Sequence, residues 1–175
     1  MELLLYPDPA LKHPPSRVER FDEALREQAR AMFDVMYKAK GVGLAGPQVD
    51  YRWRIAVINI SWEPKDEIVL VNPEVSALTG QEIDEEGCLS FPGLMGKVER
   101  AKTCTVRAFG LDGKPIEVTG EGLLARALQH ETDHLDGILF VTRLSPAERQ
   151  VMKKDLKDLE QKWKDKQKPR RIIRK

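Results

Sequence analysis

The sequence has few cysteines, few aromatic residues and no long apolar stretch. Its two cysteines, Cys88 and Cys104, cannot form the disulfide framework of a small secreted domain, which leaves free thiols or a metal ligand as their uses. The first apolar run follows no basic segment and is interrupted by Pro7 and Pro9, so we expect no signal peptide. No stretch approaches the roughly 20 apolar residues of a membrane-spanning helix. These absences predict a cytoplasmic protein without a membrane partner.

An excess of one charge is also lacking, since 29 basic and 28 acidic residues leave a net charge of +1. The balance along the chain is uneven, because residues 149–175 contain 12 Lys or Arg but only 4 Asp or Glu. A composition of 41% hydrophobic and 33% charged residues is typical of a globular protein. We therefore expect a single domain over residues 1–175 that ends in a basic helix and tail, residues 146–175.

The first half of the chain predicts one amphipathic helix and two strands. Residues 21–41 follow the helical period, and Gly41 would supply the C-terminal stop. Residues 52–60 and 67–73 are rich in β-branched side chains, and the second run ends at Asn-Pro. The apolar side chains that share the helix face are Phe21, Leu25, Met32, Phe33 and Met36.

The second half predicts a hairpin and two further helices. Two β-rich runs within residues 103–120 flank Asp-Gly, a favoured tight-turn pair. A helix follows over residues 122–135, with Gly137 just beyond its end, and another runs from Ser145 to about Lys168. The order of elements indicates the α+β class, with mixed or antiparallel strands around a central metal-binding helix, and with N-terminal and C-terminal helices. The apolar face of the central helix is expected to comprise Leu123, Leu124, Ala127, Leu128 and Leu135.

The central helix contains QHETDH, which holds two of the three histidines of the chain. His130 and His134 are four residues apart, about 400° of helical rotation, so both imidazoles project from one face. With Glu131 between them they form H-E-x-x-H, in which the histidines bind a metal and the glutamate is the general base. The alternative is a chance pair on a helix surface, but the apolar neighbours place both rings partly inside, where they need a partner.

A catalytic metal needs a third protein ligand. No histidine follows His134, although Glu148 and Glu160 do, and a downstream glutamate would match a metallopeptidase. The upstream candidate is Cys88 in EGCLS, on an expected loop or strand end. A small packed thiol is the alternative for Cys88, and it is what we expect of Cys104 in the β-rich run TCTVRAF.

Residues 41–48, GVGLAGPQ, form a glycine-rich loop that follows a helix and precedes a strand. This order is the reverse of a dinucleotide-binding turn, and the loop lacks the Lys-Ser/Thr of a phosphate-binding loop. Small residues would instead let a substrate backbone approach, with Gln48 as a neutral hydrogen-bonding group. A helix C-cap followed by a tight turn is the alternative, and it accounts for Gly41 only.

In this order and at this spacing, GVGLAGPQ, EGCLS and QHETDH resemble the three signature motifs of the peptide deformylases. The similarity extends from LLLYPDPAL at the N-terminus to about Leu144, with a C-terminal helix typical of the bacterial type. It implies a metal-dependent hydrolase that removes the N-terminal formyl group from the formyl-methionine of nascent polypeptides and releases formate.

The resemblance implies a metal site at Cys88, His130 and His134. These ligands would bind one divalent ion, Fe²⁺ in the cell, and by their softness also suit Zn²⁺, Ni²⁺ or Co²⁺. Beside this site, Glu86 and Arg100 are expected to form an ion pair that braces the cysteine motif.

The resemblance also implies the catalytic groups. Glu131 would act as general base and then as general acid. The side-chain amide of Gln48 and the backbone N–H of Leu89 would donate hydrogen bonds to the formyl oxygen. The methionine side chain would enter an apolar pocket. The expected substrate-binding residues are Val42, Gly43, Gly87, Leu123 and Ala127.

Two positions depart from the family pattern. Gly46 replaces the second alanine of the glycine motif, which we expect to loosen the loop slightly. Met95 stands where many relatives have a basic residue near the substrate backbone, so contacts with an extended peptide are expected to differ.

Two other functional classes compete with formyl-peptide hydrolysis: an H-E-x-x-H metallopeptidase and a non-catalytic, metal-stabilised ribosome-binding module. The expected partners are formylmethionyl nascent peptides and, through residues 149–175, the ribosome, since attraction to RNA phosphates needs no base recognition. The alternatives for this segment are a solvated helix whose apolar stripe packs on the body and a membrane-surface helix, for which the stripe is too narrow. We expect a monomer that binds no DNA. The stripe comprises Met152, Leu156, Leu159 and Trp163.

Overall fold

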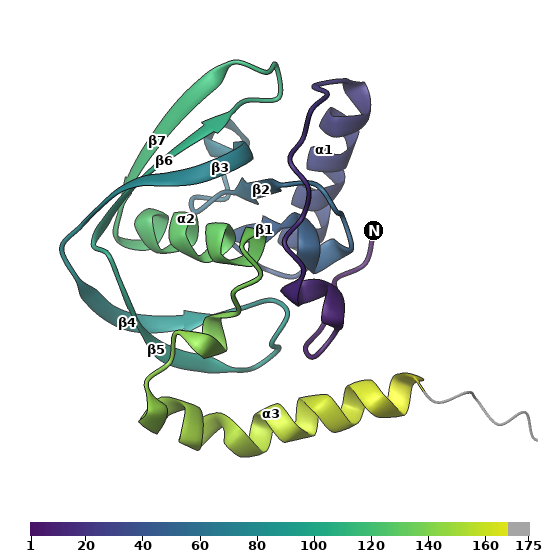
Figure 1. Ribbon diagram of the computed structural model, residues 1–175, viewed down its shortest axis with the longest axis vertical. Helices are drawn as coiled ribbons and strands as arrows, with labels where there is room; N and C mark the ends of the chain where they lie inside the picture. The colour runs from purple at the N-terminus through teal and green to yellow at the C-terminus, as the bar shows by residue number, and fades with distance from the viewer. Residues whose placement is uncertain (168–175) are drawn as a thin grey trace, which may run out of the picture.

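The computed structural model describes residues 1–167, and a buried helix, α2 (Gly122–Leu135), occupies the centre of the molecule (Figure 1). A five-stranded sheet lies on one side of α2 and a two-stranded sheet on the other, and all strand pairs are antiparallel. The predicted α+β class is confirmed. The larger sheet has the order β1 (Gly43–Ala45), β2 (Ile55–Ile58), β3 (Ile68–Thr79), β6 (Thr103–Phe109), β7 (Pro115–Glu121), and the smaller sheet pairs β4 (Glu82–Gly87) with β5 (Met95–Arg100).

The first helix, α1 (Glu23–Lys38), begins after Asp22, whose side chain accepts a hydrogen bond from the N–H of Leu25. Four of the five residues predicted to share its apolar face are buried and cluster with side chains of β2 and the first part of β3, whereas Phe21 joins the cluster from outside the helix. The predicted role of Gly41 is wrong, because Lys40 is the residue with the positive φ of 58° after the helix. Gly41 is needed for another reason: a Cβ there would lie 2.6 Å from Cδ1 of Leu89.

The third strand is longer than predicted. Asn72 and Pro73 do not end it; the chain bulges there, with a φ of 53° at Asn72, and pairing with β6 resumes at Glu74. The Asn72 side chain explains the bulge, since it accepts from the N–H of Val18 and donates to the carbonyl of the same residue. Strands β1, β4 and β5 were not predicted, because they are short or interrupted by charged residues and glycine.

The hairpin and α2 follow the sequence closely. A five-residue loop, rather than a two-residue turn, joins β6 to β7 and contains Asp112 and Gly113. Helix α2 has the predicted bounds, and Gly137 has a φ of 72° just beyond it. One assignment to its apolar face is wrong: Leu123 is 52% exposed and does not belong to the core. The residues that do pack between α2 and the sheet include Leu128, Ala125, Leu70, Ile58 and Val106.

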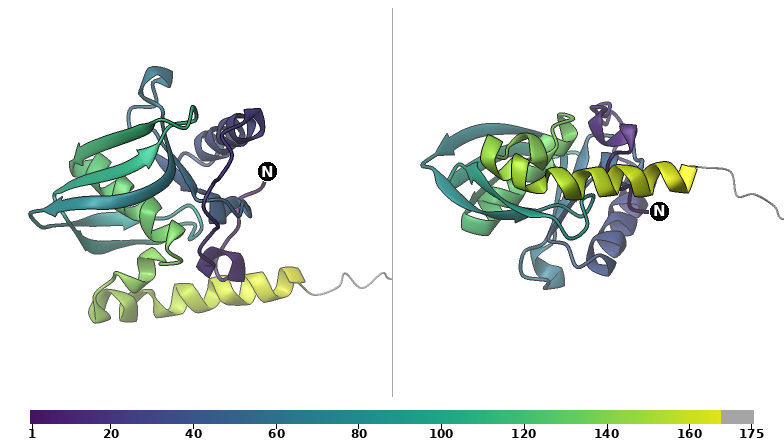
Figure 2. Two further views of the ribbon diagram at one scale, coloured as in Figure 1. Left: turned by 45° about the horizontal axis from the view of Figure 1, so that its top comes forward. Right: turned by 90° about the horizontal axis from the view of Figure 1, so that it is seen from below.

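The last helix, α3 (Pro146–Gln167), lies along the edge of the body (Figure 2). The Ser145 hydroxyl accepts from the N–H of Glu148, as expected of an N-cap, and the predicted end at Lys168 lies outside the described residues. Three residues of the apolar stripe, Met152, Leu156 and Leu159, pack in one cluster with Phe91, and the Tyr6 hydroxyl donates to Glu160 at 2.8 Å. Within residues 1–167, four short 3₁₀ helices complete the fold: η1 (Pro9–Lys12), η2 (Gly46–Val49), η3 (Pro64–Asp66) and η4 (Phe140–Thr142).

The thiol of Cys104 and the helices can be compared with the remaining predictions. Cys104 is fully buried between α2 and the sheet, and burial raises the pKa of its thiol to about 11, which confirms a packed side chain. Across residues 1–167, no helix has the combination of length and apolar character needed to cross a membrane.

The contact between α2 and the large sheet should dominate stability. Leu70→Ala removes a fully buried side chain of β3 from this contact and is expected to lower the free energy of unfolding by about 2–5 kcal/mol in urea denaturation. Leu78→Ala, the same change on the same strand at a 54% exposed position, should cost about 0.5 kcal/mol or less. Equal losses would contradict this packing.

Candidate metal centre

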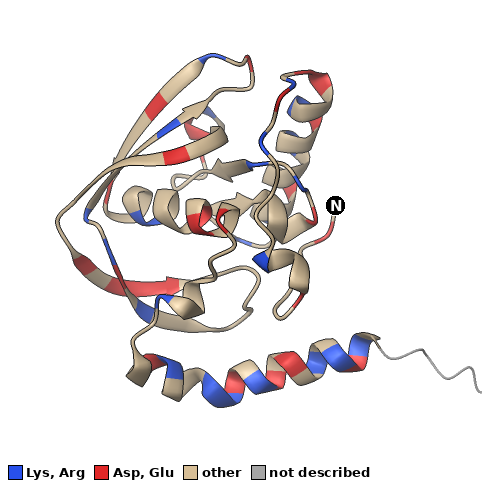
Figure 3. Ribbon diagram, viewed as in Figure 1, with Lys and Arg blue, Asp and Glu red and all other residues tan. Residues whose placement is uncertain are grey.

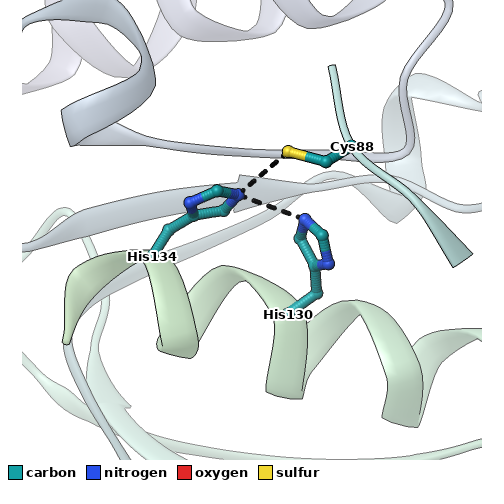
Figure 4. Close-up of side chains that lie close together, drawn as sticks. All are labelled: Cys88, His130 and His134. Carbon is teal, nitrogen blue, oxygen red and sulfur yellow. Dashed lines mark hydrogen bonds between the residues drawn. The ribbon is translucent and has the colours of Figure 1, made fainter. Parts of the chain in front are cut away.

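Helix α2 and the end of β4 bring three potential metal ligands together (Figure 4). The Nε2 atoms of His130 and His134 are 3.1 Å apart, and Sγ of Cys88 lies 3.2 Å from Nε2 of His134. All three ligand atoms lie within 4.8 Å of one another, and they form the only such group in residues 1–167. The predicted cluster is therefore assembled by the fold.

The donor set fits a divalent cation. One thiolate and two imidazoles are ligands that Zn²⁺, Fe²⁺, Co²⁺ and Ni²⁺ accept, and three protein ligands leave a position for water. Burial lowers the pKa of His134 well below its usual value, which keeps that ring in the neutral form that a ligand requires. Packing of a core does not require the thiol of Cys88 and the imidazoles of His130 and His134 to meet, whereas binding of a metal ion does.

The outer side of His130 is held by a buried ionic network. Its Nδ1 lies 2.7 Å from Oε1 of Glu86. Arg100 in turn donates two hydrogen bonds to the Glu86 carboxylate, from Nη2 at 2.7 Å and from Nε at 3.0 Å. The predicted Glu86–Arg100 ion pair is confirmed. Burial opposes ionisation of Glu86, but hydrogen bonds from His130 and Arg100 outweigh it and hold the Glu86 pKa far below its usual range. The site also contains partners that the sequence analysis missed: Arg126, which bonds Glu86, and Asp133, which bonds Arg100 and Arg143.

The carboxylate of Glu131 lies beside the ligands in a buried position. Burial raises its pKa to about 7, and within residues 1–167 its Oε2 has no hydrogen-bond partner. A Cβ at Gly43 would overlap Oε1 of Glu131. The glycine was predicted to admit the substrate backbone, and the structure adds a second requirement, room for this carboxylate.

The two expected oxyanion donors lie next to Cys88. The Gln48 amide is oriented, because its Oε1 accepts from the N–H of Ala45 at 2.8 Å while its Nε2 donates to the Ser90 hydroxyl at 3.2 Å. Nε2 is thereby placed 3.5 Å from Sγ of Cys88. The backbone N–H of Leu89 donates to no acceptor among the described residues. Ser90 was missed by the sequence analysis, although it belongs to the EGCLS motif.

A cavity of about 640 Å³ opens onto these groups, a size typical of small-ligand sites. All five predicted substrate-binding residues line it, and the exposed Leu123 lies on its wall, which explains why that leucine is not in the core. Met95 is also at the wall, with its Sδ over Gly87. The cavity-lining residues of the predicted set are Val42, Gly43, Gly87, Leu123 and Ala127.

Gly46 lies in a tightly packed part of the loop. A Cβ at this position would lie 2.7 Å from the carbonyl oxygens of Trp53 and Tyr51, and the residue is buried. The glycine therefore allows close backbone packing under the loop that carries Gln48.

The chain is similar to known proteins over almost its whole length. The family model of polypeptide deformylase matches residues 1–150. The peptide deformylase of Chromobacterium violaceum is 48% identical over 160 residues, which cover 91% of this chain and 96% of that relative. The peptide deformylase of Acidobacterium capsulatum is 46% identical over 160 residues, with 90% and 94% covered.

Solved structures agree with these relatives. The crystal structure of a peptide deformylase from Legionella pneumophila matches with a TM-score of 0.86 at 46% identity and covers 96% of this chain and 98% of its own. Peptide deformylase 1B of Arabidopsis thaliana, crystallised with an inhibitor, matches with a TM-score of 0.91 at 39% identity and covers 98% of each chain.

The third ligand can be tested by metal analysis. Cys88→Ala is expected to reduce bound metal from about one ion per chain to a small fraction, because two imidazoles alone hold a divalent ion weakly. Glu148→Ala and Glu160→Ala should leave the metal content unchanged, since these side chains contact the N–H of Lys97 and the Tyr6 hydroxyl instead. Loss of metal in a glutamate variant but not in Cys88→Ala would contradict the assignment.

Proposed function

The chain belongs to the peptide deformylase family and catalyses peptide deformylation, and on this premise we propose which of its groups perform the reaction. One observation supports the proposal above all: the three ligand atoms of Cys88, His130 and His134 lie within 4.8 Å of one another, and Cys88 and His130 line the same cavity as Glu131. A hydrolytic site requires this combination of a cation, a base and space for a small carbonyl group.

The proposed chemistry is hydrolysis of the formyl amide. Cys88, His130 and His134 would hold a divalent cation, which when bound would supply the Lewis acidity that makes water a nucleophile near neutral pH. Glu131 accepts the proton of the attacking water at Oε2 and delivers it to the leaving nitrogen as the carbon–nitrogen bond breaks. The products are formate and a peptide with a free N-terminal methionine.

Two donors hold the formyl oxygen as negative charge develops on it. The Gln48 amide is suited to this role because Ala45 and Ser90 fix its orientation, so no reorganisation is required during the reaction. The N–H of Leu89 is the second donor, and its lack of a partner among the described residues supports this role.

The apolar part of the cavity receives the methionine side chain. Val42, Leu123 and Ala127 form the proposed pocket, and burial of a thioether on such a wall is favourable. Gly43 and Gly87 flank the path of the substrate backbone, and Met95 at the rim replaces a charged contact by an apolar one for residues that follow methionine.

We propose Fe²⁺ as the ion bound in the cell. The ligand set alone suits four metals, and the resemblance to the family supports iron among them. Ferrous iron beside a thiolate is prone to oxidation, so protein handled in air is expected to carry zinc or nickel, or an oxidised Cys88.

The metallopeptidase alternative lacks a third ligand in this structure. Among the described residues, neither Glu148 nor Glu160 belongs to the metal-binding group. The non-catalytic alternative, a metal-stabilised ribosome-binding module, gives no reason for an unpartnered buried carboxylate at Glu131.

Formate release from formyl-Met-Ala-Ser, with metal content measured on the same oxygen-free sample, tests the proposal. Metal-loaded protein should release formate, and Glu131→Gln should keep its metal while kcat falls by about 10²- to 10⁴-fold, because the proton acceptor is lost. Glu99→Gln, the same change at an exposed position outside the cavity, should match the unmodified protein. Absence of formate from metal-loaded protein, or full activity in Glu131→Gln, would contradict the mechanism.

The ribosome remains the proposed partner of the C-terminal segment, in the cytoplasm and with a monomeric enzyme. The described part of this segment supports it, since Met152, Leu156 and Leu159 of α3 pack on the body while lysines cover its exposed sides, interspersed with acidic residues (Figure 3). Residues 168–175 lie outside the described part. Deletion of residues 149–175 would also remove Met152 and Leu156 from the core, so a charge variant is the cleaner test.

Reversal of three exposed lysines on α3, Lys154, Lys157 and Lys164, to glutamate should weaken salt-sensitive ribosome binding, because contacts with RNA phosphates are lost. Turnover of formyl-Met-Ala-Ser should stay unchanged. A control with the same charge change elsewhere, at Lys38, Lys65 and Lys102, should retain ribosome affinity. Equal affinities of the two triple variants would refute the proposed role of α3.

A further inference from the structure

A continuous chain of ionic hydrogen bonds leads from the metal ligand His130 to the molecular surface. Glu86 bonds Nδ1 of His130, Arg100 bonds Glu86 with two nitrogens, and Asp133 accepts from Nη1 of Arg100. The last member is Arg143, whose Nη2 and Nε both donate to Asp133, at 2.5 and 3.1 Å.

The exposure of the side chains in this hydrogen-bond network rises from Glu86 to Arg143. The side chains of Glu86 and Arg100 are each 4% exposed and that of Asp133 is 10% exposed, whereas that of Arg143 is 44% exposed. Arg143 borders a hollow of about 470 Å³, lined in part by Gln129, Thr132 and Asp133 on another side of α2 from the catalytic cavity. The chain therefore connects solvent with the outer side of a metal ligand.

Arg100 donates hydrogen bonds to two carboxylates, those of Glu86 and Asp133, and Arg143 shares the second of them. Its Nε and Nη2 hold Glu86, and its Nη1 holds Asp133. Without Arg143, the buried Asp133 would depend on Arg100 alone and would compete with Glu86 for it, because a buried carboxylate needs full compensation. Glu86 would then hold the His130 ring less firmly.

We propose that Arg143 is a positioning residue for the metal centre: by neutralising Asp133, it leaves Arg100 free to hold Glu86, and Glu86 then fixes the His130 ring. Groups that orient a metal-bound histidine commonly contribute 10- to 100-fold to metal affinity. Arg143 acts through three intermediates, so its contribution should be smaller. The inference rests on the proposed metal site, and metal retention can test it without reference to substrate.

Arg149 offers a matched control. It is also an exposed arginine beside η4, and its Nε and Nη2 both donate to the carbonyl of Val141, so its loss removes two hydrogen bonds from the same segment. It does not contact Asp133. A purely structural effect should therefore appear in both variants, and a positioning effect only at Arg143.

The experiment compares protein loaded with Zn²⁺ or Co²⁺ for the unmodified chain, Arg143→Gln, Arg143→Lys and Arg149→Gln. A chelator should remove Zn²⁺ from Arg143→Gln about 3- to 10-fold faster than from the unmodified chain. The rate of removal from Arg149→Gln should lie within about twofold of the rate for the unmodified chain. Arg143→Lys keeps the positive charge but cannot make the bidentate contact with Asp133, so its rate of zinc loss should lie between those of Arg143→Gln and the unmodified chain. The visible absorption bands of bound Co²⁺ should shift in Arg143→Gln only, which loss of stability alone would not produce.

Equal rates of metal loss in Arg143→Gln and Arg149→Gln, or an unchanged Co²⁺ spectrum in Arg143→Gln, would overturn the inference and leave the metal site itself intact. Failure of the unmodified chain to bind either metal would instead refute the proposed function. The two failures are thus distinguishable.

Discussion

The burial of a polar helix is the constraint on which this structure depends. Seven of the eleven buried residues in α2 have polar or charged side chains, and each such group must find a partner inside the protein. Two of them, His130 and His134, converge with Cys88 in a metal-binding group. Two others are held by neighbouring segments: Gln129 by the backbone of Ala101, and Asp133 by arginines from β5 and from the connection to α3. Among the described residues, Oε2 of Glu131 is the exception, because it has no hydrogen-bond partner.

The same constraint explains why elements far apart in sequence surround α2. The two-stranded sheet provides Glu86 and Arg100 on one side, and the larger sheet provides an apolar surface on the other. Neither sheet alone could cover a helix with both kinds of side chain. The two sheets thus cover the apolar side and the charged side of α2, and residues at the end of β4 line the catalytic cavity together with residues of α2.

Close packing, more than flexibility, accounts for the glycine-rich loop. Gly41 makes room for the Leu89 side chain, Gly43 for the Glu131 carboxylate, and Gly46 for two backbone carbonyls. None of the three has a positive φ. The loop thus brings Gln48 and the Cys88 segment to the same wall of the cavity, with space for a small carbonyl group between them and the helix.

Several features of this protein could be predicted from the sequence because they depend on residues that are close together along the chain. The four-residue spacing of His130 and His134, the bounds of α2 and the stripe of α3 follow from helical geometry, and three ordered motifs identified the family. Short-range patterns could not locate β4 or β5, where pairing across the sheet overrides weak propensity, nor the bulge at Asn72, which long-range hydrogen bonds to Val18 impose. Likewise, the spacing of charges along the chain gave no sign that Arg143 and Asp133 reach the metal ligand through Arg100 and Glu86. That choice belongs to the tertiary structure, because a buried charge takes its partner from whichever segment folding brings within hydrogen-bonding distance.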